Sequence, residues 1–290
     1  MILVLSGATA SGKSKLALEL AKAIDGEIVN ADAFQVYKGI EIATAAPKEE
    51  EKKSVPHHLY GYLSVDEEYS IARYQTDARR IITDILKRKK TPILVGGSGL
   101  YIRSALYDYD LSVDTSDVDM TKYLALDDIA LHKVLEQLDP EEANKIHPNN
   151  RRRVYRDIEI CLALGKSKTE FLKEQKHEPI YPTKFFILKK SRDSLYEISS
   201  LRVDKMFEDG LLEQIVPMIE KYGENAPAFK AIGIKEIFPY LHHEKSLEEA
   251  KEDIKKNTKH YIKRQETFFA YQFPSIYVSS LEDIIENIND

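Results

Sequence analysis

The residues that could do chemistry begin with eight consecutive positions near the start of the chain. They read Gly7-Ala8-Thr9-Ala10-Ser11-Gly12-Lys13-Ser14 and fit the pattern G-x-x-x-x-G-K-[ST] of a phosphate-binding loop. In such a loop the glycines allow tight backbone turns, successive amide N–H groups point into one concavity, and the following helix adds positive potential. Lys13 would reach the terminal phosphate and Ser14 would ligate Mg²⁺. The sequence therefore predicts a polyphosphate site.

A carboxylate and an amide follow the next apolar segment. Residues 27–32 read as a strand whose end delivers Asp32, and then Gln35, into a loop. Ligands of open α/β sheets bind beyond the carboxyl ends of the strands, so Asp32 is expected near the phosphate loop. An aspartate at a strand end can equally serve as a turn or cap residue. Position alone does not choose between these two roles.

Two basic stretches occur in a chain whose formal net charge is −6. Residues 151–156 carry four arginines, and residues 251–264 carry six lysines and arginines against two acidic residues. The negative net charge argues against nonspecific coating of nucleic acid, but local basic patches can still position RNA. A solvated helix face is the alternative for either stretch.

The elements that position these residues can be read from periodicity. Residues 2–5 predict a strand, residues 14–24 and 70–88 predict amphipathic helices, and residues 91–95 predict a buried strand. The last strand ends in Gly96-Gly97-Ser98-Gly99, which indicates a backbone kept small for a bulky substrate. Residues 44–58 read as a loop that ends in His57 and His58. These two adjacent histidines point in different directions and have no third candidate ligand nearby, so we do not expect a zinc site.

The second half of the chain predicts a helical insertion and then a return to the sheet. Residues 107–128 are acidic and irregular, and helices follow at 129–138, at 141–146 after Asp139-Pro140, and up to 164 before Gly165. A strand is expected at 184–190, a helix carrying Arg202 at 195–209, and a turn at 227–236 that enters another helix. A long helix should run from a capping box at Ser246 to about residue 271, followed by a strand at 275–278.

These elements predict an α/β fold with a P-loop-type parallel sheet flanked by helices. Residues 1–106 and 184–290 would form this core, and residues 107–183 an inserted helical subdomain. The composition, 43% hydrophobic and 31% charged, is ordinary for a soluble protein, and no segment is long enough to span a membrane. The short apolar start reads as a strand and not a signal peptide, and the single cysteine, Cys161, suits a reducing cytosol and a core position. We expect a cytoplasmic, monomeric protein without membrane contacts.

Seven stretches of the chain, taken together and in order, resemble the tRNA dimethylallyltransferase (IPP transferase) family. They are GATASGKS at 7–14, NADAFQVYKG at 30–39, VGGSGLYI at 95–102, IHPNNRRRVYR at 146–156, LRVDKMFEDGL at 201–211, FKAIGIKE at 229–236 and NTKHYIKRQETFF at 257–269. The resemblance implies transfer of a five-carbon prenyl group from dimethylallyl diphosphate to N6 of the adenosine just 3′ of a tRNA anticodon, adenosine 37. The inserted subdomain would then contact the anticodon stem-loop.

The resemblance also assigns roles to residues, and the chemistry agrees with them. An exocyclic amine is a weak nucleophile, so its attack on an allylic carbon gains from a carboxylate base and from cations on the departing diphosphate. Asp32 matches the base, residues 7–14 the diphosphate site, Ser14 the Mg²⁺ ligand, and Thr9 and Arg202 further catalytic residues. Gln35 would read the flipped adenine. The positions that match tRNA contacts are Asp32, Ala33, Phe34, Gln35, Ser98, Arg152, Arg153, Arg156, Lys230, Gly233, Lys235, Arg264 and Gln265.

Some positions depart from the family pattern, and other functions remain open. Ala33 replaces a serine, Ile198 an arginine and Phe268 a tryptophan, and the segment between Leu106 and Leu131 is shorter than usual. Arg202 would therefore carry the diphosphate alone on its helix. The alternatives are a small-molecule kinase that uses ATP, an adenylate isopentenyltransferase, and a noncatalytic RNA-binding module that uses the loop as a nucleotide switch. The arginine-rich insertion speaks against the first two.

Overall fold

A computed structural model describes residues 1–111 and 113–289 of the chain. It divides into two compact units, one formed by Met1–Leu106 with Tyr181–Asp290 and the other by Tyr107–Ile180. The first unit resumes a few residues before position 184, because the amide of Ile2 donates a hydrogen bond to Pro182 O and so ties residue 182 to the sheet. Each unit is described by itself.

The core unit is built on one six-stranded sheet in which every strand pair is parallel. Its order is β3-β2-β4-β1-β5-β6. The strands are β1 Ile2–Ser6, β2 Gly26–Asn30, β3 His57–His58, β4 Thr91–Gly96, β5 Thr183–Leu188 and β6 Ser275–Val278. β1 and β2 are buried along their whole length, which explains why they read as near-continuous apolar runs. The predicted parallel α/β sheet is confirmed.

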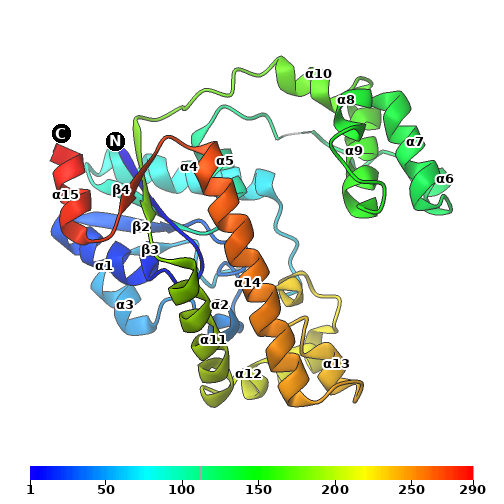
Figure 1. Cartoon of the computed structure of the whole chain (residues 1–290). Coiled ribbons are helices and arrows are strands. Elements are labelled where there is room, and N and C mark those ends of the chain that lie inside the picture. Colours follow the sequence, from blue (N-terminus) through cyan, green and yellow to red (C-terminus); the bar gives the residue numbers. More distant parts are fainter. Residues whose placement is uncertain (112, 290) are drawn as a thin grey trace. The chain divides into compact units, whose positions relative to one another are not determined.

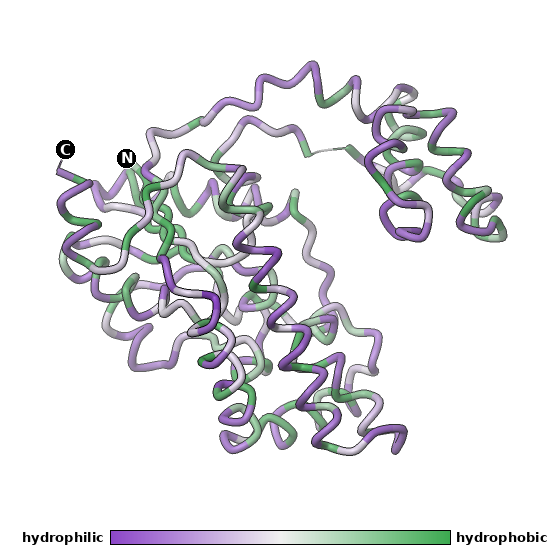
Figure 2. Tube along the Cα trace, in the orientation of Figure 1, coloured by the Kyte–Doolittle hydropathy of each residue, from purple (hydrophilic) through white to green (hydrophobic). Residues whose placement is uncertain are grey.

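Helices cover both faces of this sheet (Figure 1). α1 Lys13–Ala23 packs against β1, β2 and β4, and α15 Leu281–Asn289 packs against α1. α4 Ile71–Lys87 and α5 Gly99–Leu106 contact each other and also pack against β4. Figure 2 shows the strands coloured hydrophobic, while hydrophilic residues recur along the helices around them. A core of leucine, isoleucine and valine therefore fixes the strand ends from which the loops emerge.

Four more helices of the core unit follow β5 in the sequence. They are α11 Arg192–Glu208, α12 Leu211–Tyr222, α13 Phe238–Leu241 and α14 Leu247–Gln272. α14 packs against α11, and it also contacts α5 (Figure 1). The predicted capping box is confirmed, since Ser246 Oγ accepts the amide N–H of Glu249 and the Glu249 carboxylate accepts the amide N–H of Ser246.

The inserted unit consists of short helices around a small apolar core of their own. They are α6 Thr121–Leu124, α7 Asp128–Leu138, α8 Pro140–Ala143, α9 Arg151–Leu164 and α10 Lys168–Lys173. Leu131, Leu135, Val154 and Ile158 are fully buried between α7 and α9. Asp139 caps α8 as predicted, with Pro140 in the first turn, and Gly165 ends α9 with a φ of 66°.

Several elements differ from the sequence-based expectation. Residues 44–58, expected to be a loop, begin at the last residue of α2 Glu41–Thr44 and contain α3 Glu49–Ser54 and the edge strand β3. α3 is a helix because three acidic residues lie in its first turn and two lysines in its last, which suits the helix dipole. β3 is held by His58, whose Nε2 is 2.8 Å from the buried Glu27 carboxylate of β2. α10, α12 and α15 were not anticipated, and the helix expected at 141–146 is a single turn.

Candidate functional site

The loop that follows β1 has the backbone conformation of an anion-binding loop. Gly7 and Gly12 adopt φ values of 149° and 95°, and Ala10 between them has a left-handed φ of 69°. A left-handed alanine costs about 1 kcal/mol, so the surrounding structure must enforce this shape. A side chain on Gly7 would lie 3.0 Å from the Leu188 carbonyl of β5. The loop therefore follows β1 and lies against the carboxyl end of β5, and α1 begins directly after it.

Polar groups in this loop lack protein partners. In the part of the chain that the structure describes, the amides of Ala10, Gly12, Lys13 and Ser14 donate to no protein acceptor. The hydroxyl of Ser11, whose residue is only 2% exposed, likewise has no partner among the described residues. Unpaired donors at a helix N-terminus suit an anion with several oxygens, such as a diphosphate.

Two cationic side chains approach the loop from different elements. Lys13 comes from the first turn of α1, and Arg202 from the middle of α11, where its guanidinium donates to Ala43 O at 3.3 Å. Burial lowers the pKa of Lys13 to about 8, the nearby Asp32 carboxylate raises it, and the Arg202 charge lowers it. Burial also lowers the pKa of Arg202, and Asp32 opposes that shift. The three charges therefore lie close enough to influence one another.

Asp32 is held by the loop after β2 in one orientation. Its amide donates to Asn30 Oδ1 at 2.8 Å, and its own Oδ1 accepts the amide N–H of Phe34 at 2.9 Å. The amide of Ala33 donates to Ser98 Oγ at 3.2 Å. The turn role that the sequence left open is real, since the carboxylate caps its own turn. The other carboxylate oxygen, Oδ2, has no hydrogen-bond partner within the described residues.

These loops and helices enclose one cavity of about 520 Å³ in the core unit. The residues that line it include predicted positions from all three strand ends, namely Thr9, Ala10, Gly12, Lys13, Ser14, Asp32, Ala33, Phe34, Gln35 and Ser98. Arg202 of α11 and Arg264 of α14 also line it, as do Lys230 and Lys235 of the segment between α12 and α13. Asp32 is the only acidic residue among the described lining residues, against six lysines and arginines. The cavity is built for an anion, with one base inside it.

Comparison with known proteins decides the family. The model of the family described as IPP transferase matches residues 35–272. The tRNA dimethylallyltransferase of Anoxybacillus flavithermus is 42% identical over 285 residues, which cover 98% of this chain and 92% of that protein. The chain belongs to the IPP transferase family. The resemblance inferred from the seven sequence stretches is confirmed.

Solved structures of the IPP transferase family share the whole fold. A tRNA isopentenylpyrophosphate transferase from Staphylococcus epidermidis is 35% identical with a TM-score of 0.73, and the match covers 99% of this chain and 97% of that one. A eukaryotic dimethylallyltransferase solved in the course of acting on tRNA is 31% identical with a TM-score of 0.84, covering 97% of this chain and 74% of that one.

Two residues expected to contact RNA lie inside the protein instead. Gln265 of α14 is only 4% exposed, and its side chain joins Thr9 N to Gly97 O. Gly233 is buried with a φ of 99°, and its amide donates to the Glu236 carboxylate at 2.8 Å. Neither Gln265 nor Gly233 offers a free polar group to a ligand. The family motifs at these two positions therefore serve the packing of the site.

The three glycines at the end of β4 and the start of α5 are closely surrounded by protein atoms. A Cβ on Gly96 would lie 2.1 Å from Ala31 O, one on Gly97 would lie 2.0 Å from Gln265 Nε2, and one on Gly99 would lie 2.1 Å from the Phe268 ring. These positions are small because β2 and α14 pack directly against them. Protein atoms make a close approach at all three positions, and Gly96 also lines the cavity described above.

Gln35 is engaged at one end of its amide. Its Nε2 donates to Thr44 O at 2.9 Å and to Ala45 O at 3.1 Å, at the end of α2. The carbonyl oxygen of this amide accepts no hydrogen bond from the described residues. Gln35 therefore lines the cavity with an acceptor in a fixed orientation.

Several apolar and aromatic residues that line the cavity were not among the predicted site residues. Besides Ile198, they are Ala43, Val203, Met206, Ile232, Ile254 and Tyr261. Most of these lie on helices whose apolar spacing is that of ordinary core packing, so no local pattern marked them as site residues. Ile198, noted as a departure from the family, adds to this apolar wall and leaves Arg202 as the one basic lining residue on α11.

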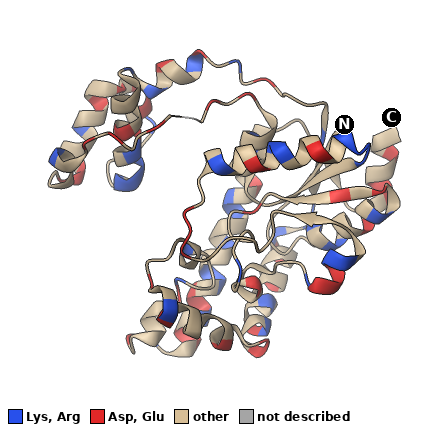
Figure 3. Cartoon of the chain, turned by 180° about the vertical axis from the view of Figure 1, so that it is seen from behind, with Lys and Arg blue, Asp and Glu red and all other residues tan. Residues whose placement is uncertain are grey.

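The arginine cluster at 151–156 belongs to the inserted unit and is partly neutralised there. Arg153 Nη2 is 2.8 Å from the Glu142 carboxylate, and Arg156 pairs with Glu159. Arg152 is exposed and has no ion pair within the described residues. Figure 3 shows both signs of charge on the helices of this unit.

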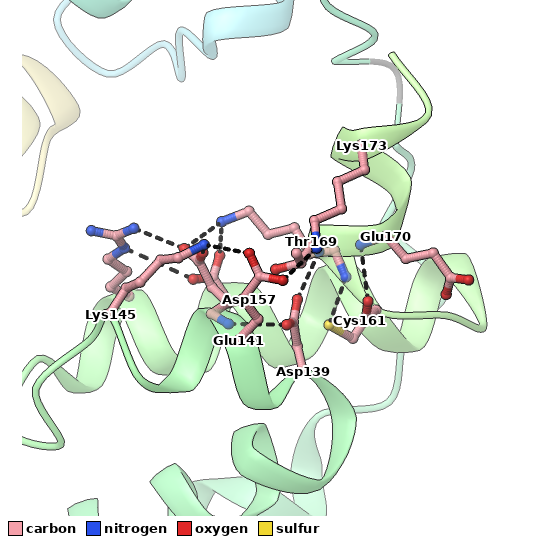
Figure 4. Close-up of polar contacts among 12 residues, drawn as sticks. Asp139, Glu141, Lys145, Asp157, Cys161, Thr169, Glu170 and Lys173 are labelled. Carbon is pink, nitrogen blue, oxygen red and sulfur yellow. Dashed lines mark hydrogen bonds and ion pairs between the residues drawn. The ribbon is translucent and has the colours of Figure 1, made fainter.

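A buried ionic cluster holds Arg153 in place. Lys168 Nζ is 2.5 Å from Asp157 and 3.4 Å from Glu142 (Figure 4). Burial raises the pKa of Asp157, and Lys168 opposes this. Burial would also raise the pKa of Glu142, but Arg153 and Lys168 together lower it. Asp139 Oδ2 accepts the amide N–H of Thr169 at 2.7 Å, which joins α8 to α10. The cluster fixes α8, α9 and α10 as one body.

Proposed function

We propose that this protein transfers a dimethylallyl group from dimethylallyl diphosphate to N6 of the adenosine immediately 3′ of the anticodon, adenosine 37, in tRNA. The observation that carries the proposal is the cavity, in which one carboxylate, Asp32, lies among Lys13, Arg202 and the free amides of the phosphate loop. Membership of the IPP transferase family and near full-length relatives named tRNA dimethylallyltransferase support it.

The acidic and basic groups of the cavity have separate roles in the proposed reaction. The adenosine N6 forms a bond to the allylic C1 of the prenyl group while the bond from C1 to the diphosphate oxygen breaks. Asp32 takes the proton that N6 loses, and the bonding electron pair leaves on the diphosphate. Lys13, Arg202 and the four free loop amides stabilise the negative charge that develops there; these amides belong to Ala10, Gly12, Lys13 and Ser14. The apolar wall around Ile198 and Met206 is suited to the prenyl tail.

Mg²⁺ fits the donor set at the phosphate loop. The Ser14 hydroxyl lines the cavity, and no cluster of three or more His, Cys, Asp or Glu residues occurs among the described residues. Mg²⁺ commonly takes one or two protein ligands and completes its shell with phosphate oxygens and water. Ser14 would hold the ion, which would neutralise the diphosphate when bound.

The tRNA would be positioned by basic residues in each unit. In the core unit these are Lys230, Lys235 and Arg264, which line the cavity, and in the inserted unit Arg152 is the exposed and unpaired arginine of its cluster in the described chain. Such contacts position RNA while loop bases give specificity. None of the helices in the described residues is long and apolar enough to cross a bilayer. We expect the enzyme to act as a monomer in the cytoplasm.

The test is incubation of the purified protein with Mg²⁺, labelled dimethylallyl diphosphate and unmodified tRNA, with parallel reactions that offer AMP or labelled ATP. Label mapped to the adenosine beside the anticodon is the expected result. Label in AMP alone would make the protein an adenylate isopentenyltransferase. ATP turnover without prenyl transfer would make it a kinase or a nucleotide switch, and either result would overturn the proposal.

A further inference from the structure

One buried side chain connects the phosphate loop with the loop after β4. Gln265 lies in the second half of α14, and its Oε1 accepts the amide N–H of Thr9 at 2.8 Å. Its Nε2 donates to Gly97 O at 3.0 Å. Both polar ends of the amide are therefore used, in a region that excludes water. The contact depends on Gly97, because any side chain there would occupy the place of the amide nitrogen.

The connection continues to the loop that carries Asp32. Ser98, next to Gly97, accepts the amide N–H of Ala33 through its hydroxyl and donates its own amide to Ala31 O at 3.1 Å. Tyr261, one turn before Gln265 on α14, places its hydroxyl 3.5 Å from Gly97 O and lines the cavity. The loops after β1, β4 and β2 thus form one hydrogen-bonded set, with Gln265 joining the first to the other two.

We propose that Gln265 is a positioning residue for prenyl transfer, setting the phosphate loop and the Asp32 loop in register without touching either substrate. The inference rests on the proposed function. The leaving group is bound by one loop and the proton acceptor stands on another, so the reaction needs both at a fixed separation. Misplacement by about 1 Å can cost on the order of a hundredfold in rate. Gln265 also occupies the Thr9 amide, which leaves the amides of Ala10, Gly12, Lys13 and Ser14 to bind the diphosphate.

This role differs in its kinetics from the RNA contact that the sequence predicted. A contact with RNA would change the KM for tRNA and leave kcat unaltered. A residue that only stabilises the fold would lower the melting temperature and leave the kinetic constants of the folded enzyme as they are. A positioning residue lowers kcat at saturating tRNA and dimethylallyl diphosphate, and leaves the dissociation constant of tRNA nearly unchanged.

The experiment compares the full chain with its Gln265→Met variant, which keeps the length of the side chain and removes both hydrogen bonds. We expect kcat to fall about 10- to 100-fold, with tRNA affinity within about twofold of the unsubstituted chain. The matched control is Gln272→Met on the exposed end of the same helix, with no change in kcat. A kcat within about threefold of the unsubstituted chain, or a change confined to the KM for tRNA, would overturn the inference.

A second variant perturbs the same contact from the other side. Gly97→Ala places a methyl group where the Gln265 amide lies, so it should lower kcat in the unsubstituted chain and lower it less in the Gln265→Met background. Additive effects would contradict the inference. If Gln265→Met does not fold, Gln265→Glu takes its place, since it can still accept from Thr9 but cannot donate to Gly97 O. Unchanged kcat in that variant would overturn the inference.

Failure of the proposed function can be separated from failure of this inference. If the unsubstituted chain transfers no prenyl group, the proposed function is wrong, and binding of inorganic pyrophosphate with Mg²⁺ then tests the coupling alone. Gln265→Met should weaken that binding about tenfold, because the phosphate loop loses the bond that fixes Thr9. Equal pyrophosphate affinity in the two proteins would overturn the inference.

Discussion

At the scale of single residues, basic side chains of the cavity suit binding of the diphosphate, and its one described acidic side chain suits acceptance of a proton. Lys13 and Arg202 suit a departing diphosphate, while Asp32 is the one acidic residue among the lining residues that the structure describes. The turn around Asp32 uses only one carboxylate oxygen, so the other stays available for a proton. A single residue at the end of β2 therefore carries the acid-base part of the proposed chemistry.

Substitution of this carboxylate should separate catalysis from binding. We expect Asp32→Asn to lower turnover by about a hundredfold or more, because an amide cannot accept the N6 proton, and to leave RNA binding nearly intact. Asp25→Asn, at the exposed start of β2, is the matched control and should keep full turnover. Rates would be measured with labelled dimethylallyl diphosphate and affinities by a filter assay. Equal turnover in Asp32→Asn would remove Asp32 as the base.

The lowered pKa of Lys13 predicts a pH dependence for diphosphate binding. Burial holds this pKa near 8, so Lys13 loses its charge as the pH rises through 8. Affinity for pyrophosphate with Mg²⁺ should then fall above that pH, by up to about tenfold per pH unit. Lys13→Arg keeps its charge over this range and corrects for titration of pyrophosphate itself. Calorimetry from pH 7 to 9.5 checks this, and parallel curves for the two proteins would contradict it.

At the scale of elements, sequence patterns predicted correctly those features that depend only on neighbouring residues. The apolar strands, the Ser246 capping box and Gly165 at the end of α9 are properties of a few adjacent residues, and each is confirmed. Gln265 shows the limit of such patterns. Its burial depends on Thr9 and Gly97, which are far away in the sequence, and its neighbour Arg264 does line the cavity. A motif on a helix therefore predicted a functional region, but not which of its side chains face the ligand.

The helix α9 supports a prediction about two neighbouring arginines. Arg153 pairs with Glu142, which is 6% exposed, whereas Arg152 has no ion pair among the residues described. Arg152→Ala should weaken tRNA binding and lower the slope of log affinity against log salt by about 1. Arg153→Ala should change that slope less and destabilise the inserted unit by about 1 kcal/mol, since Arg153 itself is half exposed and solvent screens its charge.

Salt titrations of tRNA binding and thermal unfolding of both variants measure these effects. Lys133→Ala, on α7, serves as a surface control. If Arg153→Ala flattened the salt dependence and Arg152→Ala did not, Glu142 would not be holding Arg153 away from the RNA. That result would keep the predicted RNA contact for Arg153 and remove it for Arg152.

At the scale of the whole molecule, the two units divide the proposed work. All described residues that line the cavity belong to the core unit, and the inserted unit has its own apolar core and ionic cluster. The two ends of the inserted unit lie side by side, because Tyr107 and Pro179 form an antiparallel bridge and Asp108 N donates to Glu178 O at 2.8 Å. A short linker can therefore replace the unit without stretching the core.

Removal of the inserted unit should leave a folded protein that binds diphosphate and not tRNA. We expect a chain with about four glycine and serine residues between Leu106 and Tyr181 to melt cooperatively and to bind pyrophosphate within about threefold of the full chain. Its affinity for tRNA should fall by at least about tenfold, and the salt slope should flatten as phosphate contacts are lost. Calorimetry and salt titrations measure both quantities. Unchanged tRNA binding would place the whole RNA surface on the core unit, whereas lost pyrophosphate binding would mean that the phosphate loop needs the inserted unit to keep its shape.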